Sequence, residues 1–174
     1  MEAPLLVKVA ALYHDIGKIK RPGYFIKNQT GRNPHDGLPP QESAKIIISH
    51  VEEGVKLAKK AGLPLLLIDF ILTHHGTTQA VYFYHKHLQQ VKEGTEVDEA
   101  AFCYAGPRPR SKEEVLLMHA DSIEAACKNL KDPSEEELYQ LIDKIVDGKV
   151  ASGQFQEALI SFRELHPSKF SRTR

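Results

Sequence analysis

The pair His14-Asp15 is the first feature of this sequence whose residue types suggest chemistry. A neutral imidazole and a carboxylate on adjacent residues can bind one divalent metal ion, and the second carboxylate oxygen can reach another. The same residue types recur in the pair His74-His75, in the single His50, and in Asp121 at the end of an apolar stripe. Nitrogen and oxygen donors of this kind are accepted by iron, manganese and zinc. These residues therefore predict a metal centre.

Each of these residues also has an ordinary structural interpretation. A single histidine beside an apolar stripe, such as His50, is often a buried residue held by hydrogen bonds. The pair His74-His75 fits the end of a helix, where the helix dipole favours histidine. Asp121 fits an ion pair with a buried lysine or arginine. One shared metal centre explains all of these placements together, and this is the interpretation that we prefer.

Helices are expected wherever apolar residues recur every three or four positions, and this period dominates the chain. Adjacent helix residues point about 100° apart, so His74 and His75 can face one metal only where their helix ends, and Gly76 provides such an end. No convincing strand is found, so the fold is predicted to be an all-α helical bundle. Seven helices are expected. The first carries Leu6 to Tyr13 and runs into His14, the second covers about 41–61, the third extends from Pro64 to His75, and the fourth covers about 78–91. The fifth starts at the capping box Ser111–Glu114 and carries Asp121, the sixth starts at the capping box Ser134–Glu137 and reaches about 150, and the seventh covers about 154–165.

Composition limits the classes of protein to which the chain can belong. Its 174 residues suit one domain with a sizeable core, here taken as residues 1–174. The formal net charge is zero, which argues against a DNA or RNA polymer as partner. No apolar stretch reaches the roughly 20 residues that a membrane helix needs. Cys103 and Cys127 are the two cysteines, and neither belongs to a CxxC pair. A reducing compartment is therefore expected, and a structural zinc ribbon is not.

Five segments extend the pattern well beyond the His-Asp pair. Together with His14, His50 and Asp121, they resemble the HD superfamily of metal-dependent phosphohydrolases. Within it, they resemble the cytoplasmic domain of seven-transmembrane HD receptors, whose characterised members hydrolyse cyclic di-AMP to pApA. The segments that carry this resemblance are Asp15–Pro22, Asn33–Asp36, His74–Thr77, Gly106–Glu113 and Ala120–Ala126.

The resemblance implies an HD-type helical bundle around up to two divalent metals, usually iron or manganese. Asp15 would bridge the two metals. One metal site would be completed by His50, His74 and His75, and the other by His14 and Asp121. The substrate would be a cyclic dinucleotide. The parent protein would be anchored in the cell membrane with this domain in the cytoplasm.

One departure from the family pattern concerns the segment before His14. The family carries a further histidine on a helix there, whereas the thirteen residues before His14 include none. We therefore expect an N-terminally truncated domain in which the site of His14 and Asp121 lacks one ligand. On this basis an alternative function is a nucleotide-binding or interaction module without turnover. Another alternative is an HD hydrolase that acts on a different nucleotide.

Further residues are candidates for substrate contacts. Lys18 lies about one helical turn beyond His14 and is expected to contact phosphate. Arg108 and Arg110, which alternate with Pro107 and Pro109, are candidates for holding a second phosphate. Tyr82 and Tyr84 are candidates for stacking on an adenine base. A solvated surface position is the alternative for the three cations, and a place in the core is the alternative for one of the aromatic residues.

The remaining histidines are assigned structural roles. His35-Asp36 is a second His-Asp pair, but it lies between Pro34 and Gly37, where aspartate is an ordinary turn residue. The others lack a convergent context and are interpreted as surface or packing residues: His85, His87, His119 and His166.

Overall fold

The computed structural model of the protein describes residues 3–25, 33–92, 94–128 and 130–165. In these ranges the only β-type pairing is an isolated antiparallel bridge between Gln79 and Cys103. The prediction of an all-α fold is therefore confirmed for the described residues. No helix among them is long and apolar enough to cross a membrane. The α-helices are α1 (Ala3–Tyr13), α2 (Pro40–Lys60), α3 (Leu65–Thr73), α4 (Val81–Leu88), α5 (Lys112–Cys127), α6 (Glu135–Ala151) and α7 (Phe162–Leu165).

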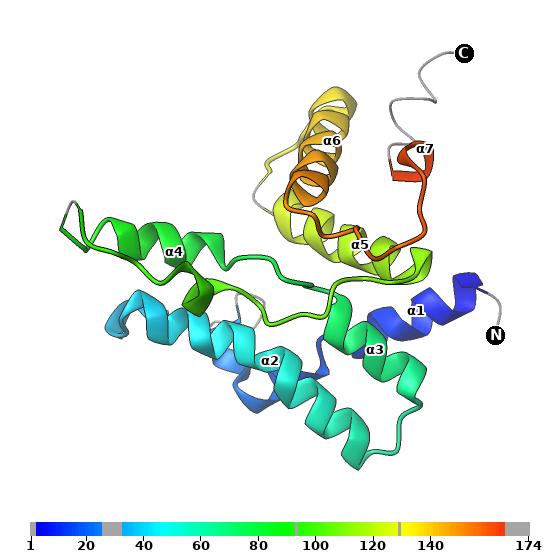
Figure 1. Cartoon of the computed structure of the whole chain (residues 1–174), viewed down its shortest axis with the longest axis horizontal. Helices are drawn as coiled ribbons and strands as arrows, with labels where there is room; N and C mark the ends of the chain where they lie inside the picture. The colour runs from blue at the N-terminus through cyan, green and yellow to red at the C-terminus, as the bar shows by residue number, and fades with distance from the viewer. Residues whose placement is uncertain (1–2, 26–32, 93, 129, 166–174) are drawn as a thin grey trace.

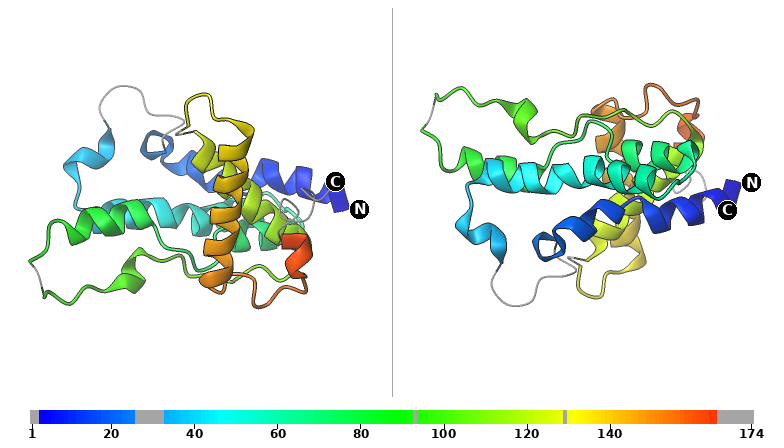
Figure 2. Two further views of the ribbon diagram at one scale, coloured as in Figure 1. Left: turned by 90° about the horizontal axis from the view of Figure 1, so that it is seen from above. Right: turned by 90° about the horizontal axis from the view of Figure 1, so that it is seen from below.

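Helix α5 lies near the middle of the molecule (Figure 1). Helices α1 and α3 pack against it from one side, and α6 packs against it from the other. Helix α2 contacts α3, α4 and the 3-10 helix η1 (Ile16–Lys20), which follows α1. Figure 2 shows that α6 runs across the direction of α2. Segments that are far apart in the sequence thus meet around α5.

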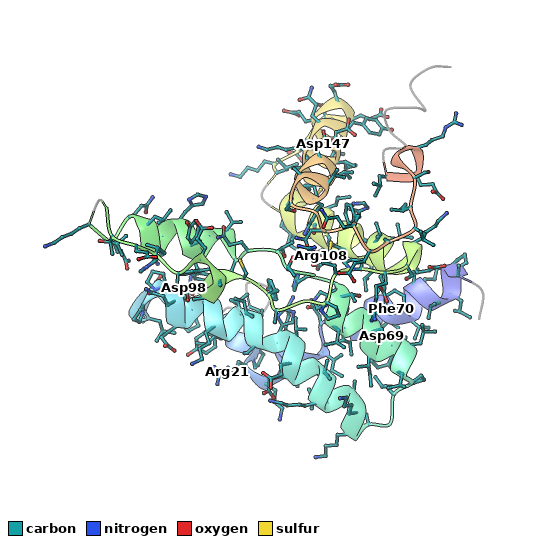
Figure 3. The ribbon with its side chains drawn as sticks, in the orientation of Figure 1. Arg21, Asp69, Phe70, Asp98, Arg108 and Asp147 are labelled. Carbon is teal, nitrogen blue, oxygen red and sulfur yellow. The ribbon has the colours of Figure 1, made fainter. Side chains whose placement is uncertain are left out.

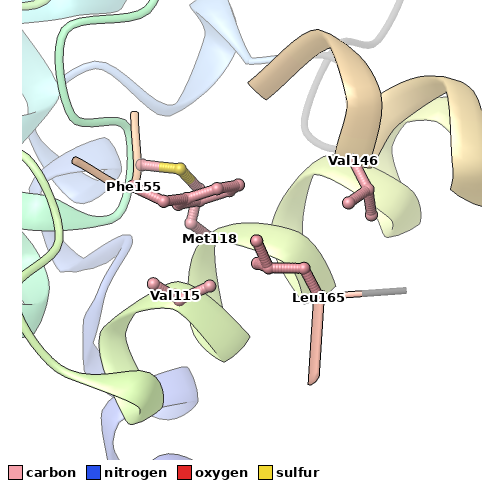
Figure 4. Packing of buried hydrophobic residues seen from close by; sticks show 5 residues of the cluster. All are labelled: Val115, Met118, Val146, Phe155 and Leu165. Atoms are coloured by element: carbon pink, nitrogen blue, oxygen red, sulfur yellow. The ribbon is translucent and has the colours of Figure 1, made fainter. Parts of the chain in front are cut away.

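Two apolar clusters hold α5 in this position. The first joins α5 to α1 and α3 and includes Phe70, whose place is labelled in Figure 3. The second joins α5 to α6, α7 and the segment between them (Figure 4). The first cluster consists of Ala10, Leu67, Phe70 and Leu117, and the second of Val115, Met118, Val146, Phe155 and Leu165.

The helix starts predicted from capping boxes are confirmed. The Ser111 hydroxyl accepts a hydrogen bond from the Glu114 backbone N–H, and the Glu114 carboxylate accepts one from Ser111 N–H, at the start of α5. Ser134 and Glu137 form the same reciprocal pair at the start of α6. At the end of α2, Gly62 has a φ of +69°, as expected for a residue that stops a helix in the left-handed conformation.

Two expected helices differ from the structure. Helix α4 is shorter than the predicted range of about 78–91. The helix predicted over about 154–165 is wrong except for its last turn, α7. Gly153 has a φ of +68°, and the buried Gln154 bonds to Thr77 instead of continuing a helix. A tertiary contact therefore overrides the local helical pattern.

The region from about 20 to 40, which was expected to be loop-like, contains two short 3-10 helices, η2 (Pro22–Tyr24) and η4 (Pro34–Gly37). Its residues 26–32 lie outside the described residues. A third short 3-10 helix, η5 (Glu99–Phe102), interrupts the predicted irregular segment after α4.

Candidate metal centre

The six predicted metal ligands come together in the structure, in two groups. Within each group the candidate ligand atoms lie within 4.8 Å of one another. The members of the two groups come from four parts of the chain: just after α1, within α2, just after α3 and within α5. One group is His50, His74 and His75, and the other is His14, Asp15 and Asp121.

The end of α3 allows two adjacent histidines to face the same region. Helix α3 stops at Thr73, and Gly76 adopts a φ of +53°. The rings of His74 and His75 then lie 4.1 Å apart between centroids. The expectation that Gly76 ends the helix at this point is confirmed.

Gly17 fixes the distance between His14-Asp15 and α2. A Cβ atom on Gly17 would lie 1.8 Å from the His50 carbonyl oxygen and 2.5 Å from the Gly54 nitrogen. Only a residue without a side chain lets η1 approach α2 this closely. The backbone contact places Asp15 next to His50, with 3.4 Å between Asp15 Oδ1 and His50 Nε2.

Three of the histidines are oriented by the same local device. In each, Nδ1 bonds to the backbone carbonyl three residues earlier: His14 to Ala11 at 2.9 Å, His50 to Ile47 at 2.6 Å, and His74 to Ile71 at 2.8 Å. A carbonyl oxygen only accepts, so Nδ1 carries a proton in each ring, and Nε2 presents a lone pair whenever the ring is neutral. Nε2 of His50 and Nε2 of His74 then lie 3.1 Å apart. Two facing lone pairs at this distance favour a cation between or beside them.

Asp15 lies between the two groups. Its Oδ1 faces His50 and, at 3.8 Å, Nε2 of His74, whereas its Oδ2 lies 3.4 Å from His14 Nε2 and also pairs with Lys18. His14 Nε2 and Asp15 Oδ1 are buried and have no hydrogen-bond partner among the described residues. Buried polar atoms are costly when unsatisfied, so these two atoms fit a metal ligand role.

Asp121 has histidine neighbours and no basic partner within ion-pair distance in the described part of the chain. Its Oδ1 lies 3.5 Å from His14 Nε2, and its Oδ2 lies 3.8 Å from His75 Nδ1. The alternative of an ion pair with a buried lysine or arginine is therefore not what the structure shows. A carboxylate directed at two imidazoles is suited to a shared cation.

Burial and charge set the protonation states of the candidate ligands. Burial, and then the neighbouring His50 and His14, lower the pKa of His74 to about 3. Burial also holds the pKa of His75 well below its usual value. Burial would lower the pKa of His14 as well, but its contacts with the Asp121 and Asp15 carboxylates prevail and raise that pKa to about 9. His74 and His75 are thus neutral imidazoles at neutral pH, as metal ligands must be.

The carboxylates are correspondingly ionised. Burial would raise the pKa of Asp15, but its contacts with the rings of His14 and His50 outweigh this and hold the pKa well below its usual range. The pKa of Asp121 is also lowered, because its contact with His14 outweighs burial. Without a metal, His14 therefore carries the positive charge that the two carboxylates attract.

Sequence reasoning missed two residues that support the centre. The buried Tyr104 ring lies 4.3 Å from the ring of His75, between centroids, and covers it. The Gln154 side chain, 1% exposed, accepts a hydrogen bond from Thr77 N–H at 2.9 Å and so braces the turn after His75. Tyr104 lies in a stretch without periodicity, and Gln154 was assigned to a helix. Nothing in the sequence around Tyr104 or Gln154 indicated a position beside the candidate ligands.

Of the predicted substrate contacts, Lys18 and Arg108 adjoin the centre. Lys18 pairs with Asp15. Arg108 Nε donates to Thr77 Oγ1 at 3.3 Å, and Figure 3 labels Arg108 on the segment that leads into α5. The remaining three residues lie elsewhere: the Tyr82 side chain is 68% exposed, Tyr84 donates to Glu99 at 2.7 Å, and Arg110 pairs with Asp69 at 3.5 Å. These contacts involve none of the candidate ligands.

The other histidines have structural surroundings. His35 is buried, and its Nε2 lies 2.9 Å from the Tyr24 carbonyl oxygen. This supports a packing role for the second His-Asp pair. His87 stacks on Phe102, and His119 packs edge-on against Phe155. His166 lies outside the described residues.

Comparison with known proteins assigns the family. A model of the HD domain family matches residues 1–126, which include all six candidate ligands. The chain belongs to the HD domain family. The resemblance inferred from the five segments is thereby confirmed, and the fold is that of an HD domain.

Two similar proteins are named as cyclic-di-AMP phosphodiesterase PgpH. The protein from Bacillus subtilis is 43% identical over 162 residues, and that from Listeria monocytogenes is 42% identical over 163. Each match covers 92% of this HD domain chain, which spans 22% of the length of either relative. The crystal structure of the L. monocytogenes PgpH HD domain in complex with cyclic-di-AMP is 41% identical, with a TM-score of 0.87, and the match covers 92% of this chain and 74% of that one.

Proposed function

We propose that this chain is a metal-dependent phosphodiesterase domain that hydrolyses cyclic di-AMP to pApA. The observation that carries the proposal is the pair of ligand groups with the Asp15 carboxylate between them. Two sites that share a carboxylate suit the cleavage of a phosphodiester. The similarity to two proteins named as cyclic-di-AMP phosphodiesterases, and to an HD domain solved with cyclic-di-AMP, supports this choice of substrate.

We assign Asp15 as the bridging ligand. His50, His74 and His75 complete one site, and His14 and Asp121 contribute to the other. Iron or manganese is the proposed metal, because the resemblance to the HD superfamily implies these metals and the imidazole and carboxylate donors suit them. When bound, such metals supply the acidity of the attacking water and positive charge for the phosphate oxygens.

The chain's own residues then serve to bind and orient the substrate. The attacking water oxygen forms a bond to phosphorus, the bond from phosphorus to the 3′-oxygen breaks, and that oxygen takes a proton. Lys18 offers an ammonium group beside Asp15 and is assigned to the phosphate that reacts. Tyr104 covers the ring of His75 and excludes water from that side of the centre. The backbone bonds of His14, His50 and His74 hold the imidazoles in place during the reaction.

Asp15 and Asp36 allow a matched test of the proposed reaction, because each directly follows a histidine but only Asp15 is a candidate metal ligand. The chain should be purified anaerobically with Mn²⁺ or Fe²⁺, incubated with cyclic di-AMP, and assayed for pApA and for metal per chain. Asp15→Asn is expected to lower both metal content and hydrolysis, the latter by more than about 100-fold. The exposed Asp36, in the structural His-Asp pair, is the control: Asp36→Asn should leave both unchanged.

Absence of pApA from the metal-loaded wild-type chain, and from a longer protein that contains it, would refute the proposed reaction. Tight binding of cyclic di-AMP without turnover in both would favour the alternative of a binding module. Hydrolysis of other nucleotides at a higher kcat/KM would refute the choice of substrate alone.

We also propose that residues 1–174 form a single HD domain, although the family match ends at residue 126. The packing of α6, α7 and Phe155 on α5 supports this (Figure 4). The resemblance to the receptor branch supports a further proposal, that a longer membrane-anchored protein carries this domain in the cytoplasm. Fractionation of cells with an antibody against the domain tests the second proposal.

A further inference from the structure

A cavity with a largely apolar lining opens beside the candidate metal centre, on the side of α6. Its volume is about 760 Å³. Thr77, two residues after His75, and Ser122, next to Asp121, form part of its wall. The opposite wall comes from α6 and from the segment after it, beyond the region that the family model matches. The cavity and the metal centre thus share the turn after α3 and the middle of α5.

The charges that line this cavity all have the same sign. The cations Arg108, Lys144 and Lys149 line it, and its lining includes no carboxylate from the described part of the chain. The chain as a whole has a formal net charge of zero, so an all-cationic lining is a local feature. Three cations around one cavity favour an anionic ligand.

Lys149 is the most unusual of the three cations. It is half-buried, and its side chain forms neither an ion pair nor a hydrogen bond among the described residues. Burial lowers the pKa of its ammonium group, an effect that the Asp121 carboxylate opposes. A half-buried cation without a partner costs free energy, and an incoming anion would remove that cost. Lys149 also lies in the last turn of α6, where the helix dipole favours a cation, and this is the competing explanation.

Arg108 is already oriented toward the same cavity. Its Nε donates to Thr77 Oγ1 at 3.3 Å, and its Nη1 donates to Gln156 Oε1 at 3.1 Å. Thr77 is itself held by the buried Gln154. The guanidinium is thus fixed by two neutral partners that leave its charge available. Next to these cations the wall is apolar, with Leu141 and Ile145 from α6. A cavity with a cationic end and an apolar wall suits a nucleoside phosphate.

We propose that this cavity binds the phosphate of the cyclic dinucleotide that is not hydrolysed, together with its nucleoside, and that Lys149 and Arg108 contact that phosphate. The inference rests on the proposed function, which places the other phosphate at the metal centre. It gives α6, which supplies no candidate metal ligand, a direct part in substrate binding. It also accounts for the selection of a substrate that has two phosphates.

Substrates with one and with two phosphates separate this role from a role in the metal centre. Lys149→Gln should raise the KM for cyclic di-AMP by about tenfold or more, since a hydrogen bond to a charged group is lost. The kcat for cyclic di-AMP, the metal content, and the kcat/KM for bis(4-nitrophenyl) phosphate should stay within about twofold, because these do not need the second phosphate. Lys149→Arg should recover part of the affinity. The exposed Lys60 is the control for charge, so Lys60→Gln should change nothing.

A chemical footprint tests the cavity without any turnover. Acetylation of Lys149, followed by mass spectrometry, should fall when cyclic di-AMP or AMP is present, whereas acetylation of Lys60 should not. If AMP protects Lys149 from acetylation but the chain neither binds nor hydrolyses cyclic di-AMP, the proposed function is refuted. The assignment of the cavity as a nucleotide site would then still stand. Hydrolysis of cyclic di-AMP by the wild-type chain, with an unchanged KM in Lys149→Gln and no protection of Lys149, would overturn the cavity assignment alone. A lower melting temperature of Lys149→Gln with unchanged affinity would assign Lys149 to the helix dipole.

Discussion

Gly17→Ala should damage the metal centre although Gly17 binds nothing. The new Cβ would lie 1.8 Å from the His50 carbonyl oxygen, and ordinary van der Waals contact begins only at 3.4 Å. The second close atom is the Gly54 nitrogen, which is also backbone, so no side chain can rotate away. Helix η1 must therefore move from α2, and Asp15 must move from His50 with it. Overpacking of this kind costs about 1–3 kcal/mol.

Three measurements on Gly17→Ala test this reasoning. The melting temperature should fall by roughly 2–4 °C for each kcal/mol lost in a domain of this size. Metal per chain should fall, because the shift separates ligands of both groups. Hydrolysis of cyclic di-AMP should fall by about 100-fold, as expected for a displacement of about 1 Å at a reacting centre. Gly23 is the matched control, because a Cβ there meets nothing within 4 Å, and Gly23→Ala should match wild type. A Gly17→Ala protein with wild-type stability and metal content would refute the close approach of η1 and α2.

Three further outcomes can be checked by thermal unfolding. Chelation with EDTA should lower the melting temperature, and Mn²⁺ should restore it in wild type but not in Asp15→Asn, because binding to the folded state alone stabilises it. Ser111→Ala should cost about 1 kcal/mol through loss of the α5 cap; an unchanged melting temperature would contradict the capping box. Glu164 pairs with Lys112 and bonds Ser161, which lowers its pKa from 4.5 to about 2. Its contribution is therefore present above pH 4.5 and lost as the pH falls through 2, so the small stability difference between Glu164→Gln and wild type should shrink over that range.

The six candidate ligands, which the structure brings together, could be selected from the sequence because several of them conflict with their local pattern. His50 and Asp121 interrupt apolar stripes, and two adjacent histidines precede Gly76 at a predicted helix end. Such conflicts are expected where function takes precedence over packing. Helix starts were also predictable, since the capping boxes at Ser111 and Ser134 are purely local.

The contacts that complete the site were not predictable, because they depend on tertiary structure. Gln154 continues a helical pattern in the sequence, but its amide is used by Thr77, which is 77 positions away. Tyr104 has no periodic neighbours, and its position over His75 follows from the path of the chain after η5. Arg110 looked equivalent to Arg108 in the sequence, but only Arg108 faces the cavity, whereas Arg110 pairs with Asp69 at the surface.

The hydrogen bonds of three histidines explain how helices build this centre. Each bond joins Nδ1 to a carbonyl three residues earlier, which is a distance that a helical turn sets. The backbone carbonyl of the same turn therefore holds Nδ1 and directs Nε2 toward the centre, so no side chain from another element is needed to select the tautomer. Such ligands can be moved only by moving a helix. For this reason we expect the backbone contact of Gly17 with α2, and the bracing of Thr77 by Gln154, to help set the positions of the candidate ligands.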